Sequence, residues 1–118
     1  MQHNSEIKKL SEEIKASQKI LIALGDEMRQ HLILTMMENG DCNGMRVNDI
    51  AAYTRLSRPA VSHHLQILKD AGIVKMRREG TKNYYYFDAD MEAMDGLIAM
   101  LKYAKEIMAM LPDRSGDD

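Results

Sequence analysis

The sequence has few aromatic residues, two prolines, no tryptophan and a single cysteine. Cys42 has no partner for an internal disulfide, so we expect a reducing, cytoplasmic location. No apolar run approaches the roughly 18 residues that span a bilayer, and the polar start, MQHNSEIKKLSEE, lacks the apolar core of a signal peptide. These absences exclude a disulfide-stapled scaffold and predict a protein without membrane contact.

Enzyme motifs are also missing, because the chain has no Gly-rich phosphate loop, no paired-carboxylate pattern and no nucleophile–base pattern. Its 118 residues suffice for about one domain and leave little room for a deep cleft. Hydrophobic residues make up 45% and charged residues 29%, as in ordinary globular proteins. We therefore expect one domain over residues 1–118, without enzymatic activity or a cofactor.

Acidic residues slightly outnumber basic ones overall, but the basic residues are concentrated in one block. The formal net charge is −2, whereas residues 55–82 carry a balance of +5. A contiguous basic block is what a phosphate-binding surface requires, so nucleic acid is a candidate partner. The block contains Arg55, Arg58, Lys69, Lys75, Arg77, Arg78 and Lys82.

Hydrophobic spacing predicts the secondary structure. Apolar residues three and four apart predict helices over 5–24 and 90–111, and Asp26 is a candidate N-cap for a helix that ends near residue 39. Residues 47–72 predict helix, tight turn, helix, because Ser57 and Pro59 are typical of a helix start. Then IVKMRR and KNYYYFD, joined by EGT, predict a β-hairpin over 73–88.

A helix-turn-helix followed by a hairpin is a winged helix in outline, a mainly helical fold with a small β-hairpin. Val61, Leu65 and Leu68 share one face of the second helix, which we expect to be buried. The outward residues are then free to contact base edges and phosphates, and the hairpin cations to reach the DNA backbone or minor groove. The candidate contacts are Arg58, Ser62, His63 and Gln66 on the helix, and Arg77, Arg78 and Lys82 on the hairpin.

The stretch VNDIAAYTRLSRPAVSHHLQILKDAGIVKMRREGTKNYYYFD, together with ALGDEMRQHLIL before it, resembles the ArsR/SmtB family of winged-helix repressors. The resemblance implies a homodimer through the first and last helices, with reading helices about 34 Å apart on a near-palindromic double-stranded operator. It matches Ser57 to the family's capping serine. It also matches Arg58, Ser62 and His63 to groove-facing positions, and Arg77, Arg78 and Lys82 to the wing.

One departure from the family pattern is Arg55, which stands where family members often have glycine. If the turn keeps a positive φ, arginine there costs about 1 kcal/mol relative to glycine. In return, the side chain adds a candidate phosphate contact.

His63 and His64 raise the question of a metal site or a catalytic pair. Neighbouring residues lie about 100° apart on a helix and do not converge on one ion. We therefore expect His63 to be a DNA-facing donor and His64 to be partly packed, with a nitrogen toward backbone or phosphate.

The resemblance also directs attention to two recognised metal sites. One uses a Cys-Val-Cys pair in the third helix, but VNDIAAYT has no thiol, and the other uses histidines in the last helix, which has none. The carboxylates Asp88, Asp90, Glu92 and Asp95 are poor zinc ligands alone, and we interpret them as favourable charge at a helix N-terminus. We expect no metal.

The sequence thus predicts a homodimeric, sequence-specific DNA-binding regulator, a repressor by resemblance, whose effector it does not reveal. A winged helix used for protein–protein contacts is one alternative. A repressor that responds to redox state through Cys42, or to a small ligand, is another. The last helix is rich in methionine, which is typical of a core or dimer interface but would also suit a pocket for a hydrophobic effector.

Overall fold

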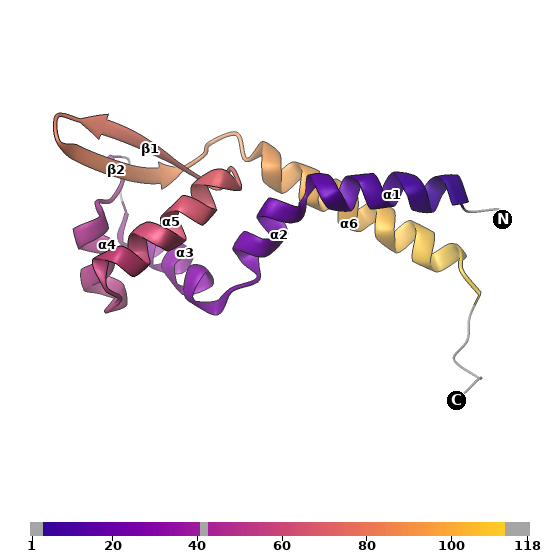
Figure 1. The fold of residues 1–118 in the computed structure, drawn as a ribbon, viewed down its shortest axis with the longest axis horizontal. Coiled ribbons are helices and arrows are strands. Elements are labelled where there is room, and N and C mark those ends of the chain that lie inside the picture. Colours follow the sequence, from indigo (N-terminus) through magenta and orange to yellow (C-terminus); the bar gives the residue numbers. More distant parts are fainter. Residues whose placement is uncertain (1–3, 41–42, 113–118) are drawn as a thin grey trace.

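The structure, a computed structural model, describes residues 4–40 and 43–112. Figure 1 shows a body made of α2 to α5 and the hairpin, and an arm, α1 with α6, that projects from the body. The expected class, mainly helical with a small hairpin, is confirmed. The elements are α1 (Asn4–Ala16), α2 (Gln18–Leu24), α3 (Glu27–Asn39), α4 (Val47–Thr54), α5 (Arg58–Asp70), β1 (Val74–Glu79), β2 (Lys82–Phe87) and α6 (Glu92–Met110).

The core of the body is built on the inner face of α5. Val61, Leu65 and Leu68 are completely buried there, against Leu32 of α3 and Ile50 of α4. Burying a side chain of this size stabilises a fold by roughly 2 kcal/mol. The predicted inward face of α5 is therefore confirmed, and its opposite face is held toward solvent.

The turn between α4 and α5 depends on one left-handed residue. Arg55 has φ 62° and ψ 19°, and its backbone N–H donates to the carbonyl of Ala51 at 2.9 Å. Helix α5 then begins with Ser57 as N-cap, whose Oγ accepts from the backbone N–H of Ala60 at 3.2 Å. The capping serine was expected from the sequence, and the positive φ at Arg55, which the sequence left open, is present.

Strands β1 and β2 form the wing, an antiparallel hairpin that turns at Gly80, where φ is +64°. Because side chains alternate along a strand, one face of the wing carries Lys75, Arg77, Glu79, Lys82, Tyr84 and Tyr86. The opposite face carries Val74, Met76, Arg78, Asn83, Tyr85 and Phe87. Two hydrogen bonds of 2.8 Å between Met45 and Tyr85 tie the wing to the chain before α4.

The single helix expected over 5–24 is wrong, because the chain bends at Ser17 and forms α1 and α2 instead. Ser17 has φ −98° and ψ 5°, and its N–H is shared between the carbonyls of Glu13 and Ile14, each at 3.1 Å. Such shared bonds are common at helix ends. Serine also stands here where the apolar stripe needs a hydrophobic residue, and it is a weaker helix former.

The arm keeps much of its apolar surface in solvent. Helix α1 buries none of its residues, and Ile7 is 47% exposed. On α6, Ile98 and Leu101 are more than half exposed. Among residues 4–40 and 43–112, no helix has both the length and the apolar character to cross a membrane.

The approach to α6 differs slightly from expectation. The helix begins at Glu92, with Glu92 and Asp95 in its first turn as interpreted. Asp88 acts elsewhere: its Oδ1 accepts from the N–H of Asp90 at 3.0 Å and lies 3.5 Å from the Nζ of Lys75. Its carboxylate thus fixes the end of the wing rather than the start of the helix.

Candidate nucleic-acid interface

The outward face of α5 is polar and open to solvent. Arg58, Ser62, His63 and Gln66 are all exposed, on the side of the helix opposite the core. The amide of Gln66 donates to Asp70 Oδ1 at 2.9 Å, so this side chain is already held one turn along its own helix. The structure therefore presents the predicted helix residues on one accessible surface.

A polar groove joins this surface to the wing. Arg58 and Ser62 line it from α5, and Asn83 and Thr81 line it from the hairpin. Sequence reasoning missed its other polar lining residues, Arg46 and Asn48 at the start of α4, as well as both hairpin residues. Asn83 also has a buried Oδ1 without a hydrogen-bond partner in the described structure. The two arginines, Arg46 and Arg58, make this groove favourable for an anionic backbone.

The three wing cations that the sequence singled out lie in different environments. Arg77 is partly exposed and is held by neighbouring side chains of the wing. Its Nε pairs with Glu79 Oε1 at 3.0 Å, and its guanidinium lies 5.1 Å from the Tyr84 ring centroid and 5.9 Å from that of Tyr86. Arg78 lies on the opposite face, where its Nε donates to the Gly80 carbonyl at 3.0 Å. Lys82 is exposed beside the turn.

The two histidines also differ in environment. His63 is exposed, whereas His64 is half-buried, and their ring centroids lie 5.8 Å apart. The packed partner of His64 is the guanidinium of Arg29, with Nη1 and Nδ1 3.4 Å apart. The expected difference in burial is present, and Nδ1 of His64 faces an arginine side chain rather than the backbone. A phosphate contact by His64 stays a prediction.

The family model described as bacterial regulatory protein, arsR family, matches residues 29–76, which span α3, α4, α5 and the start of the wing. An uncharacterized HTH-type transcriptional regulator from Methanocaldococcus jannaschii is 42% identical over 79 residues, covering 67% of this chain and 85% of the relative. The chain belongs to the ArsR family.

This ArsR-family protein is also similar to a repressor in sequence and to a DNA-binding domain in structure. The transcriptional repressor SdpR of Bacillus subtilis is 40% identical over 63 residues, which cover 53% of this chain and 66% of SdpR. The homodimeric winged helix-turn-helix DNA-binding domain of a Mycobacterium bovis protein aligns with a TM-score of 0.57 and 23% identity, covering 89% of this chain and 87% of that one. The fold is a winged helix-turn-helix.

Potential metal-ligating residues are dispersed in the part of this ArsR-family protein that the structure describes. Within the described ranges, no three His, Cys, Asp or Glu side chains come together in a way that holds a metal ion. Cys42 lies outside the described residues, so its role as an untuned thiol or a redox sensor stays a prediction.

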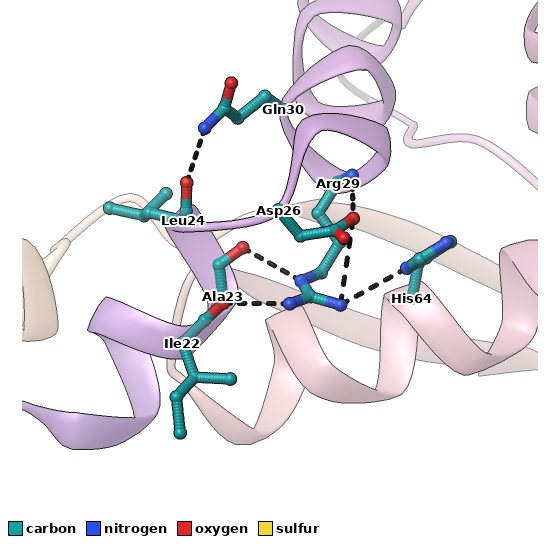
Figure 2. Close-up of polar contacts among 7 residues, drawn as sticks. All are labelled: Ile22, Ala23, Leu24, Asp26, Arg29, Gln30 and His64. Atoms are coloured by element: carbon teal, nitrogen blue, oxygen red, sulfur yellow. Dashed lines mark hydrogen bonds and ion pairs between the residues drawn. The ribbon is translucent and has the colours of Figure 1, made fainter.

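Sequence reasoning missed Arg29, the residue that ties α2 to α3 (Figure 2). Its Nε donates to the Ala23 carbonyl at 2.9 Å and its Nη2 to the Ile22 carbonyl at 2.8 Å, while Gln30 donates to the Leu24 carbonyl at 2.7 Å. These carbonyls belong to the last turn of α2, where the i+4 donors of a continuing helix are missing. The Ile22 carbonyl also accepts from the backbone N–H of Gly25 at 3.3 Å. A cation at this end is also favoured by the helix dipole.

Asp26 completes the junction. As N-cap of α3, its Oδ2 accepts from the Arg29 backbone N–H at 3.0 Å. This hydrogen bond is the main reason that the pKa of the Asp26 carboxyl lies below its ordinary value. The carboxylate is therefore negative at neutral pH and lies 3.9 Å from Arg29 Nη1.

Proposed function

We propose that this protein is a homodimeric, sequence-specific DNA-binding transcriptional regulator that acts as a repressor in the cytoplasm, not as an enzyme. The observation that carries the proposal is the exposed polar face of α5, joined by a groove to the wing, in a chain of the ArsR family. A helix held on a rigid core with a polar outer face can enter the major groove. SdpR, a repressor by name, supports the direction of regulation.

The roles of individual side chains follow from their exposure. Arg58, Ser62, His63 and Gln66 would face base edges and phosphates from α5, with Ser57 fixing the helix start. Arg78 and Lys82 would contact the DNA backbone from the wing, and Arg77 would add its charge while bracing the tyrosine face. Arg46 and Asn48 join this set as groove residues.

The exposed apolar surface of the arm supports the homodimer. Ile7, Ile98 and Leu101 are between 47% and 57% exposed, and a second copy would remove this surface from water. The Mycobacterium bovis domain is homodimeric, and we extend that state to this chain by proposal. Twofold symmetry then predicts a near-palindromic operator with half-sites about 34 Å apart.

Selection of bound duplexes from a random DNA pool tests this function. We expect one near-palindromic sequence to be enriched, with binding that weakens steeply with salt by about 0.9 log units per log unit for each phosphate contacted. Recovery without any enriched sequence would contradict the proposal and favour the protein-contact alternative.

Substitutions then assign the roles. Ser62→Ala and His63→Ala should relax base preference, whereas Arg78→Ala should lower affinity for all duplexes alike. Lys8→Ala, an exposed cation of α1 in the arm (Figure 1), is the matched control and should change neither. Equal losses on specific and random DNA for all three interface variants would refute the assignment.

A further inference from the structure

One buried guanidinium joins three helices of the body. The side chain of Arg29 is only 10% exposed, and it reaches the last carbonyls of α2 from its place on α3 while its Nη1 meets His64 of α5 (Figure 2). We name these contacts, of Arg29 with Ile22, Ala23 and His64, the Arg29 latch. The latch connects α5, the proposed reading helix, directly to α2, the segment that continues into the arm.

The chemistry of the latch fixes the protonation state of His64. Arginine stays protonated and can only donate, so Nδ1 of His64 must be the acceptor in the 3.4 Å contact. A ring that accepts at Nδ1 is neutral and carries its proton on Nε2. A second proton, on Nδ1, removes the acceptor and turns the ring into a cation next to the Arg29 guanidinium.

We infer that Arg29 is a positioning residue for the reading helix, and that protonation of His64 opens the latch and weakens sequence-specific DNA binding. This inference rests on the proposed function. In the proposed dimer, the two joined arms hold the two α2 helices in place. The link from α2 to α5 in each subunit then sets the distance and the tilt between the two copies of α5, the proposed reading helices. Reading two half-sites one helical turn apart depends on that geometry, whereas non-specific phosphate contact does not.

The surroundings of His64 oppose its protonation. Burial is the main cause that lowers the pKa of the His64 imidazole, and the charges of Arg29 and His63 lower the pKa further. Asp26 acts in the opposite direction, but its carboxylate already accepts from the Arg29 backbone and faces the guanidinium. His64 is therefore neutral at pH 7 and accepts a proton only in acid, at the expense of the latch.

The test measures affinity from pH 8 to pH 5.5 at constant ionic strength, on the enriched duplex and on a random duplex. His64→Asn places an amide oxygen near the position of Nδ1, so it keeps an acceptor for Arg29 but cannot titrate. His63→Asn is the matched control, because His63 is the exposed neighbour on the same helix. His63→Asn lowers affinity at pH 8 by its own role and leaves the acid response in place.

In the wild type and in His63→Asn, we expect the ratio of specific to random affinity to fall on acidification, by at most about tenfold per pH unit for each subunit. In His64→Asn the ratio should stay constant. Coincident profiles for wild type and His64→Asn would overturn the inference, as would a profile that only His63→Asn flattens.

A second measurement needs no DNA. Long-range proton–nitrogen NMR of the imidazole rings in the free protein should show His64 as the Nε2–H tautomer at pH 7.5. A proton on Nδ1 at that pH would refute the latch. If no duplex is enriched at all, the proposed function fails, and the NMR result still decides whether Arg29 holds His64 as inferred.

Discussion

Replacing Arg55 with glycine should stabilise this protein and weaken its DNA binding at the same time. Arg55 adopts φ 62°, a conformation that costs a residue with a Cβ atom roughly 1 to 2 kcal/mol. Glycine removes that cost, but it also raises the conformational entropy of the unfolded chain, which lowers the free energy of unfolding by about 0.4 to 1 kcal/mol. The net expected increase in the free energy of unfolding is about 0.5 to 1 kcal/mol relative to Arg55→Ala. Arg55→Ala keeps the Cβ atom and serves as the matched control.

Urea unfolding at one fixed protein concentration measures this gain, since a dimer's stability depends on concentration. The midpoint should rise for Arg55→Gly and stay near the wild type for Arg55→Ala. Both variants should bind specific and random duplexes less tightly by the same factor, because the exposed guanidinium contributes charge alone. If Arg55→Gly is less stable than Arg55→Ala, the strain argument is wrong.

Three further predictions concern the cap, the pH response and the arm. Ser57→Ala loses the hydrogen bond from Ala60 and should cost about 1 kcal/mol in urea unfolding, whereas Ser62→Ala, with no capping role, should cost less. Because the pKa of His64 in the folded protein lies below 6.5, the unfolded chain binds the proton first. Thermal stability should therefore be constant just above pH 6.5 and fall below it, and His64→Asn should flatten this fall. Leu101→Asp on the arm should give monomers in light scattering, while Leu34→Asp, an equally exposed leucine of α3, should leave the dimer intact; dissociation of both would argue against the arm as the interface.

The reading helix and the wing were predictable because their signals are local. Ser57 and Pro59 mark the start of α5, and three apolar residues at helical spacing define its buried face. The change from helical spacing to alternation of every second residue predicts the hairpin. The resemblance also singled out Arg55 as a position where family members often have glycine, and φ is 62° there. Each of these signals acts within a few residues of the element that it specifies.

Contacts between distant segments were not predictable in the same way. Arg29 and His64 are 35 positions apart, and only the packing of α3 on α5 brings them together. A cation in the first turn of a helix opposes the helix dipole, and this was the one available signal that Arg29 serves another element. The stacking of Arg77 on Tyr84 likewise depends on strand register, which places them directly opposite.

The crowding of tyrosines on the wing has a practical consequence for experiments. The chain has five tyrosines and no tryptophan, and three of the five are consecutive in β2, beside the surface proposed to meet DNA. Their emission is therefore an intrinsic optical reporter, weighted toward the half of the molecule that we propose engages the duplex. Binding can be followed in the unlabelled protein, with the Arg77 side chain close enough to two of those rings to make the signal sensitive to wing rearrangement.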